Sequence, residues 1–217
     1  MRVYLVRHGQ SIAHDTGKRQ SPDSPLSEKG IAQALSLARK IKKWDVSFDK
    51  VFSSDLARAK QTAEIIAKGL NCPVEIFAGI HEKEQNPDLY GLDTNSKLHE
   101  ENVRAYEKHL KDLDYKFLGK GESVREVVAR AMKFKKHLLR MHLDQDVLVV
   151  SHGIFIRSFI VSCILGDNYH DSSLAELYTA LDIGNTGVSL LEYRRGKGSW
   201  RVIYLNNFSY LSGISSN

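Results

Sequence analysis

Three clusters of polar residues in this sequence each follow a short run of β-branched and aromatic residues. Each cluster contains a histidine or an arginine, which are side chains that bind anions and exchange protons. The runs are typical of buried strands, and in an open α/β sheet ligands gather at the carboxyl ends of the strands. The clusters are Arg7-His8-Gly9, Ser53-Ser54-Asp55 with Arg58, and Ser151-His152-Gly153. We therefore expect two histidines and two arginines to meet in one pocket.

Such a pocket suits a phosphate group. Arg7 and Arg58 stay charged, and each offers a planar fork of donors that matches phosphate oxygens. A glycine after each histidine lets the chain turn and lets a ligand approach the backbone. A single Arg-His-Gly or Ser-His-Gly triplet is weak evidence, but their occurrence in order and at predicted strand ends favours a phosphate site.

The elements that must position these clusters alternate between strands and helices. Apolar runs predict strands over 3–6, 49–55, 73–79 and 146–150. Apolar residues at helical spacing predict helices over 26–44, 56–70, 123–141 and 154–165. The chain closes with a predicted strand pair over 186–194 and 199–206. This alternation predicts an α/β fold.

Residues 81 to about 121 interrupt the alternation. Residues 81–97 read as a loop and residues 101–113 as a charged helix, so we expect an insertion over one end of the sheet. The stretch 11–25 is a polar loop, and residues from about 208 to 217 are expected to form a loose tail. No stretch has the composition of a linker, so residues 1–217 are interpreted as a single domain.

The composition restricts the function classes. The 31 basic and 26 acidic residues give a net charge of +5, which suits an anionic small molecule or nucleic acid. We expect no nucleic-acid binding, because no aromatic-rich basic module occurs and the lysines have the spacing of solvated helix faces. Examples are Lys40, Lys42, Lys43, Lys133, Lys135 and Lys136. The two cysteines, Cys72 and Cys163, predict plain core thiols without metal-ligand spacing.

The most apolar window, 147–165, has the length of a membrane span. His152, Gly153 and Arg157 interrupt it, and it divides more naturally into a strand and a helix. The first residues lack the long apolar region of a signal peptide. We therefore predict no membrane association and a cytoplasmic location.

Five motifs together resemble the histidine phosphatase superfamily, in its phosphoglycerate-mutase-like branch. They cover nearly the whole chain and comprise residues 7–11 (Arg-His-Gly-Gln-Ser), 25–30 (Pro-Leu-Ser-Glu-Lys-Gly), 53–63 (Ser-Ser-Asp-Leu-Ala-Arg-Ala-Lys-Gln-Thr-Ala), 121–123 (Gly-Glu-Ser) and 151–153 (Ser-His-Gly). The resemblance implies a three-layer α/β/α sandwich around a mostly parallel sheet, with the insertion forming part of a lid.

The resemblance also implies roles for individual residues. His8 would be the nucleophile that forms a phosphohistidine, without a metal ion or other cofactor. The expected phosphoryl- and substrate-binding residues are Arg7, Arg58, His152, Gln10, Ser11 and Gly153. Two cations beside the imidazole would disfavour its protonation and offset charge in the transition state.

Some positions depart from the family pattern. Residues 80–82 (Ile-His-Glu) fit the first part of the family's acid element, which makes Glu82 the favoured general acid. Lys83, Glu84 and a distant Gly91 replace the second part, and Glu84 is the alternative acid. His14 stands where many members place a phosphate-contacting asparagine, and a loop histidine without a function is an equal alternative. Asn185 and Thr186 precede a strand near the expected pocket, where capping or turn duty is an alternative to binding.

We therefore predict a metal-independent phosphatase that hydrolyses phosphomonoesters through His8. The alternatives are a cofactor-dependent phosphoglycerate mutase, a non-catalytic phospho-binding module and a metal-dependent hydrolase, although no His-Glu-x-x-His motif occurs. The expected partner is a phosphorylated small molecule, with a phosphopeptide also open; the oligomeric state is not readable. Six residues of the insertion could recognise a second anionic group, a sugar or a phosphopeptide, or could equally form a solvated lid surface: Lys83, Tyr90, Lys97, His99, Arg104 and His109.

Overall fold

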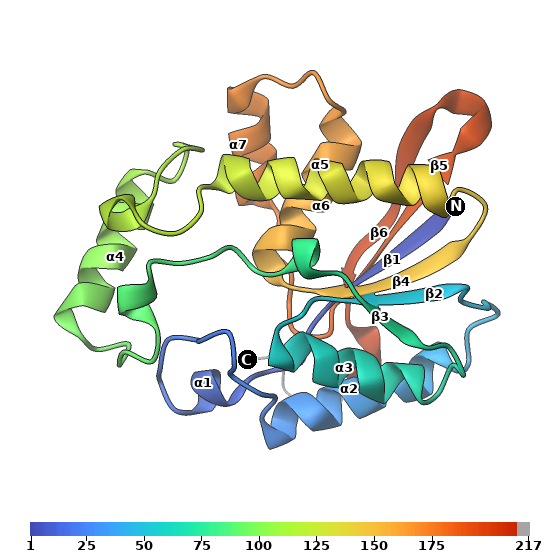
Figure 1. Ribbon diagram of the computed structural model, residues 1–217, viewed down its shortest axis with the longest axis horizontal. Coiled ribbons are helices and arrows are strands. Elements are labelled where there is room, and N and C mark those ends of the chain that lie inside the picture. Colours follow the sequence, from blue (N-terminus) through green and yellow to red (C-terminus); the bar gives the residue numbers. More distant parts are fainter. Residues whose placement is uncertain (212–217) are drawn as a thin grey trace.

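The computed structural model describes residues 1–211. Its centre is one sheet of six strands: β1 (Arg2–Arg7), β2 (Lys50–Ser53), β3 (Val74–Ile76), β4 (Asp146–Ser151), β5 (Val188–Arg194) and β6 (Ser199–Asn207). The strands lie in the order β3-β2-β4-β1-β5-β6 (Figure 1). Strands β1 to β4 are parallel to one another. Strand β5 runs antiparallel to its neighbour β1, and β6 runs antiparallel to β5, with which it forms a hairpin.

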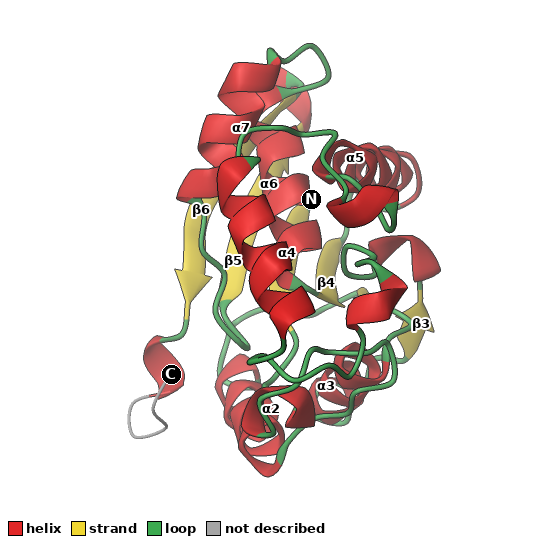
Figure 2. Ribbon diagram, turned by 90° about the vertical axis from the view of Figure 1, so that its left-hand side faces the viewer, coloured by secondary structure: helices red, strands yellow, loops and turns green. Residues whose placement is uncertain are grey.

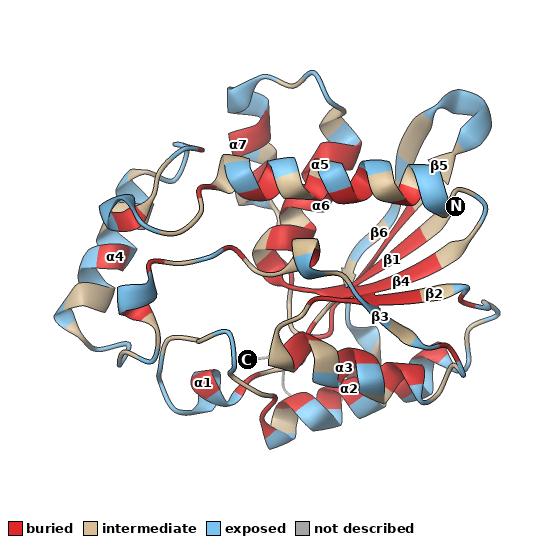
Figure 3. Ribbon diagram, in the orientation of Figure 1, coloured by how far each residue is buried: buried red, intermediate tan, exposed pale blue. Residues whose placement is uncertain are grey.

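Helices cover both faces of the sheet and make a three-layer α/β/α sandwich, as predicted. One face carries α2 (Glu28–Ile41) and α3 (Ala57–Ala67). The other carries α5 (Val124–Met141) and α6 (Gly153–Leu165), with α7 (Asp171–Ala180) packed against α6 (Figure 1). Burial is concentrated on the central strands and on the helix faces turned toward them (Figure 3).

The central strands are apolar on both sides because both of their faces are covered. In β1, Val3 and Leu5 belong to the core under α5 and α6, while Tyr4 and Val6 belong to the core against α2 and α3. The same alternation holds in β4. Polar side chains can therefore begin only where a strand leaves the two cores, as happens at Arg7.

Side-chain caps fix where the main helices begin. The Ser27 hydroxyl accepts a hydrogen bond from Gly30 N at 3.1 Å at the start of α2. Ser123 and Glu126 form a reciprocal capping box at the start of α5. The apolar window 147–165 divides into β4 and α6, as predicted, and no helix within residues 1–211 is long and apolar enough to span a membrane.

The insertion contains α4 (Lys97–Lys108), which lies over the carboxyl ends of the parallel strands and is in front in Figure 2. The predicted helix over 101–113 was therefore placed about one turn too late. Ser96 caps α4 by accepting a hydrogen bond from His99 N at 3.4 Å, which starts the helix within the predicted loop. Among the residues of α4, only Asn102 is buried.

Other elements also differ from the predictions. The loop 11–25 contains a one-turn helix, α1 (Ile12–Asp15), and α7 was not predicted at all. Lys135, expected on a solvated face, is buried because its ammonium group donates to Ser162 O at 2.8 Å and pairs with Asp167. Both cysteines are buried and free, as predicted.

The start of the predicted tail is packed rather than loose. Residues 209–211 form a short 3-10 helix, and the Leu211 side chain is buried. The Tyr210 hydroxyl donates a 2.5 Å hydrogen bond to Thr186 O, which ties this turn to the loop before β5. The remainder of the predicted tail, 212–217, lies outside the described residues.

Candidate active site

The sheet order brings the three polar clusters to one edge. Strand β4 lies between β1 and β2, with Arg7 opposite Ser151 and Ser53 opposite Val150. Because these strands are parallel, their carboxyl ends meet. The structure thus brings His8, Arg58 and His152 together, whereas Arg7 and Arg58, which the sequence placed in one pocket, line two neighbouring cavities.

His8 is buried, with 1% of its surface exposed. Its Nδ1 lies 2.6 Å from its neighbour's carbonyl oxygen, Gly9 O, and Arg58 Nε lies 3.2 Å from its Nε2. Because a carbonyl can only accept and a guanidinium can only donate, Nδ1 carries the proton and Nε2 holds the lone pair. Burial, and then the charges of Arg58 and Arg7, hold the His8 pKa well below its ordinary value. The imidazole is therefore neutral.

The two arginines are held by backbone carbonyl groups. Arg58, at the start of α3, donates through Nη1 to Ser21 O at 3.2 Å, and burial lowers its pKa to about 10, so it remains a cation at neutral pH. Arg7 donates through Nη1 to Ile183 O at 2.6 Å. Its buried Nε has no hydrogen-bond partner within residues 1–211. Arg7 therefore keeps an unused donor in the site.

His152 lies beside His8, with ring centroids 4.9 Å apart. Its Nε2 is 2.9 Å from the hydroxyl of Ser54, while its buried Nδ1 lacks a partner within the described chain. Burial, followed by the proximity of His8 and Arg58, lowers the pKa of His152 well below the ordinary value. The site thus has a second unsatisfied polar atom beside the proposed nucleophile.

Glu82 lies at the wall between two cavities. One, of about 440 Å³, is shared with Arg58, and the other, of about 420 Å³, is shared with Arg7. Its Oε1 accepts hydrogen bonds from Lys83 N at 2.9 Å and from Ile154 N, at the start of α6, at 3.1 Å. Glu84 lines the first of these cavities but not the second. The placement favours Glu82 over Glu84 as the acid.

Gly153 lines the cavity at Arg7, and an added Cβ would lie 3.6 Å from Arg7 Nε. The backbone at the start of α6 therefore packs directly against the arginine side chain. Gly153, one of the expected substrate-binding residues, therefore also supports the Arg7 side chain.

The side chains of Gln10 and Ser11 are occupied by neighbours. Gln10 donates to Asp15, and the Ser11 hydroxyl accepts from Gln20 Nε2 at 2.7 Å. His14 and Gln20 line the cavity at Arg7 and contact each other. The structure therefore brings His14 and Gln20 to the cavity wall, and gives Ser11 the task of positioning Gln20.

Thr62 is a buried residue of the site that the sequence reasoning missed. Its hydroxyl accepts a hydrogen bond from Gly9 N at 3.1 Å and donates one to Arg58 O at 2.8 Å. It thereby joins the loop of His8 to the helix that carries Arg58. The available signal was its spacing, since a threonine four residues after Arg58 lies on the same helix face.

Asn185 and Thr186 hold the backbone around His8. Asn185 Nδ2 donates to His8 O at 3.0 Å, and Thr186 N donates to Arg7 O at 3.0 Å. Thr186 adopts a left-handed conformation with φ of 56° to do so. Both residues therefore stabilise a turn, which is one of the roles considered from the sequence.

Close packing of the His8 loop against α2 requires a glycine at position 9. A Cβ at Gly9 would lie 2.5 Å from Gly30 O, and a Cβ at Gly30 would lie 2.0 Å from Gln10 O. The nucleophile loop and the first turn of α2 are thus in direct backbone contact. The expectation that a ligand approaches the backbone at Gly9 does not describe this position.

No group of three or more His, Cys, Asp or Glu side chains within residues 1–211 is arranged to hold a metal ion. The positive charge near His8 comes from Arg7 and Arg58, which donate from fixed positions. The arrangement can accept a dianionic group between the two guanidinium groups and a neutral imidazole.

Several known proteins resemble this chain in sequence, in fold or in both. A "Metal-independent phosphoserine phosphatase" of Arabidopsis thaliana is 28% identical over 98% of this chain and 84% of its own. A probable phosphoglycerate mutase of Cronobacter sakazakii is 34% identical over 97% of this chain and 95% of its own. A mycobacterial glucosyl-3-phosphoglycerate phosphatase is 24% identical in sequence. Its structure superposes on this one with a TM-score of 0.79 and covers 94% of this chain and 98% of that one. A family model, the histidine phosphatase superfamily (branch 1), matches residues 3–207, and the chain belongs to this superfamily.

Proposed function

We propose that this protein is a metal-independent phosphatase that hydrolyses phosphomonoesters through a phosphohistidine at His8. The observation that carries the proposal is the buried, neutral His8, whose Nε2 lone pair faces Arg58 in a site lined by cations. The Arabidopsis relative, itself described as a metal-independent phosphatase, supports the same chemistry.

In the first step, Nε2 of His8 attacks phosphorus as the bond to the ester oxygen breaks. Arg7 and Arg58 stabilise the charge on the non-bridging oxygens, and the unpaired Nδ1 of His152 is available for a third contact. The proton of His8 stays on Nδ1 and remains hydrogen-bonded to Gly9 O, which stabilises the positive imidazole of the phosphohistidine. Glu82, in its protonated form, gives its proton to the departing alkoxide.

In the second step, the carboxylate of Glu82 takes a proton from water as the water oxygen attacks phosphorus. The phosphorus–nitrogen bond breaks, its electron pair returns to Nε2 of His8, and inorganic phosphate leaves. Backbone donors from Lys83 and Ile154 hold the Glu82 carboxyl group at the cavity wall in both steps.

A phosphoglycerate mutase is the second candidate, favoured by the Cronobacter relative that carries this description. It would use the same site but return the phosphoryl group to an organic acceptor. The two candidates differ in products: with 3-phosphoglycerate, a phosphatase releases inorganic phosphate, whereas a mutase forms 2-phosphoglycerate without net release. The segment after Glu82 lacks the Arg-His-Tyr-Gly sequence expected of the mutase, which favours the phosphatase.

The test is turnover of phosphorylated metabolites and p-nitrophenyl phosphate in the presence of a chelator. Rapid quenching should trap an acid-labile, alkali-stable phosphoenzyme. His8→Ala should abolish both the label and turnover, while His170→Ala, which removes an imidazole remote from the site, should preserve them. Normal turnover by the folded His8→Ala protein would refute the assignment, and binding without any turnover by the wild type would indicate a phospho-binding module.

A further inference from the structure

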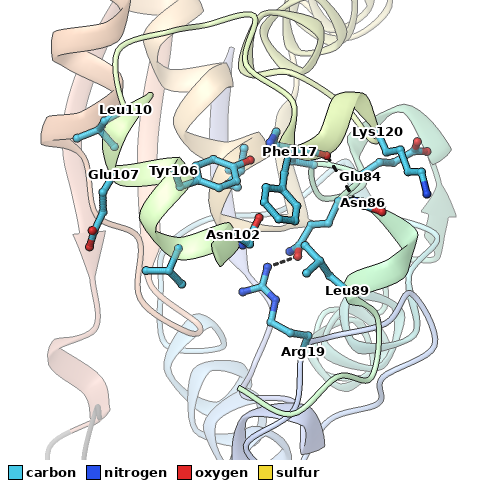
Figure 4. A pocket seen from close by; sticks show the side chains of 14 residues that line it. Arg19, Glu84, Asn86, Leu89, Asn102, Tyr106, Glu107, Leu110, Phe117 and Lys120 are labelled. Carbon is cyan, nitrogen blue, oxygen red and sulfur yellow. Dashed lines mark hydrogen bonds between the residues drawn. The ribbon is translucent and has the colours of Figure 1, made fainter. Parts of the chain in front are cut away.

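A third cavity, of about 450 Å³, lies between α4 and the segment 83–89. Its walls are mainly apolar, with contributions from Leu89, Val103, Tyr106, Leu110, Phe117 and Ile154. Figure 4 shows Tyr106 and Phe117 on one side of this space and Leu89 on another, with Asn102 and Arg19 directed into it. A volume of this kind holds a ring-sized organic group.

Lys83 supplies a buried cation to this cavity. Only 5% of its surface is exposed, and its ammonium group lies 4.6 Å from the centre of the Tyr106 ring. Within residues 1–211 this ammonium makes no ion pair, although buried lysines are nearly always paired. Burial lowers its pKa to about 8, so it is still mainly protonated at neutral pH. Glu122, Glu82 and Glu126 act on this ammonium group electrostatically, but none of them lies within ion-pair distance of it. An anion entering the cavity would be a direct partner for this charge.

Two further polar groups at the cavity are unsatisfied. The buried Nε of Arg19 and the Oδ1 of Asn102 have no hydrogen-bond partner in the described part of the chain. Asn102 is 4% exposed and is the one buried residue of α4. Buried polar groups are normally paired, so unpaired ones at a cavity wall point to a polar ligand.

The cavity adjoins the site around His8. Lys83 and Gln85 also line the cavity at Arg58, and Arg19, Gln85 and Ile154 also line the cavity at Arg7. Glu82, the proposed acid, precedes Lys83 in the chain. A phosphoester bound with its leaving oxygen at Glu82 would therefore have its alcohol portion beside the Lys83 ammonium group.

We propose that this cavity binds the alcohol portion of the substrate, and that the portion is a ring-sized apolar group carrying a carboxylate, which binds Lys83. A single negative charge fits better than a second phosphate, because Glu84 and Glu107 also line the cavity. This inference rests on the proposed function, since the same molecule must place its phosphate at His8.

The probes are 3-(4-carboxyphenyl)propyl phosphate and its neutral carboxamide analogue, whose primary alkoxide leaving groups differ only in the remote ring substituent. The wild type should prefer the carboxylate in kcat/KM, and Lys83→Met should reduce this preference about 10- to 100-fold, as expected for a charge-assisted contact. Lys120→Met is the matched control and should retain the preference, because Lys120 lines the same cavity but is exposed and paired with Asp88. The preference should also decline as pH rises through about 8, where free Lys83 loses its proton.

The same preference should be present in the dissociation constants of the two probes for the His8→Ala protein, measured by calorimetry. Equal affinities and equal kcat/KM values in the wild type would overturn the inference, as would an unchanged preference in Lys83→Met. Hydrolysis of p-nitrophenyl phosphate but of neither probe would also overturn it. If no phosphoester is hydrolysed yet His8→Ala binds the carboxylate probe selectively, the cavity assignment stands and the proposed function fails.

Discussion

Replacing Thr62 by valine tests whether the link between the His8 loop and α3 stabilises the site. Valine keeps the shape of threonine but leaves Gly9 N, now donating to Thr62, without a partner in a buried position. Arg58 O retains its partner in the helical ladder, so the loss of the second bond costs little. An orphaned buried donor costs about 1–3 kcal/mol. We expect Thr62→Val to lower the free energy of unfolding by that amount.

Urea denaturation at pH 7.5 measures this change, provided that the m-value stays constant. Thr179→Val is the matched control, because the Thr179 hydroxyl also donates to a carbonyl four residues earlier, at 2.9 Å, but sits on partly exposed α7. It should change the free energy of unfolding by less than about 0.5 kcal/mol. Turnover by Thr62→Val should also fall, because Arg58 and Gly9 lose their common anchor. Equal stabilities for the two variants would refute the reasoning.

Three further predictions concern the chemistry and its pH dependence. Arg58→Lys should reduce kcat/KM for p-nitrophenyl phosphate about 30- to 1000-fold, since an ammonium group cannot replace a bidentate fork; near-normal kinetics would show that Arg58 does not touch the phosphoryl group. In single-turnover transfer to His8, Glu82→Gln should slow an alkyl phosphate far more than p-nitrophenyl phosphate, whose leaving group needs no proton. Glu84→Gln should not discriminate, and the opposite result would move the acid to Glu84. Folding lowers the pKa values of His8 and His152, so the unfolded chain binds more protons than the folded chain. Denaturation curves should therefore show the free energy of unfolding falling as the pH drops below about 6.5. A rise would contradict the buried, neutral state of the two imidazoles.

The central fold could be predicted because its signals are local and repeated. A short apolar run that ends in Arg7 and His8 is compatible with a strand leaving a covered sheet, and parallel strands bring such ends together. The boundaries of α4 were harder, because its surface is largely charged and its start depends on the Ser96 cap. The helix α7 was not predicted because its sequence lacks a strong periodic pattern.

The supporting contacts of the site could not be predicted in the same way. Thr62 and Asn185 bind Gly9 N and His8 O, which are distant in the sequence, and nothing in the residues around them reveals those two partners. The burial of Lys135 could not be predicted either. The lysine spacing that is typical of a solvated helix face also allows the ammonium group of Lys135 to reach Ser162 O. Local patterns identify chemical groups, whereas three-dimensional packing decides what each group supports.

The contact between Gly9 and Gly30 has a consequence for how such an enzyme can change its substrate. At this contact backbone lies against backbone, so no side chain can be exchanged there to adjust the position of His8 relative to α2. The cavity beneath α4, in contrast, is bounded by side chains that can vary in size and charge. The proposed function therefore predicts that substitutions in the insertion change the specificity, while the geometry of phosphoryl transfer at His8 stays constant.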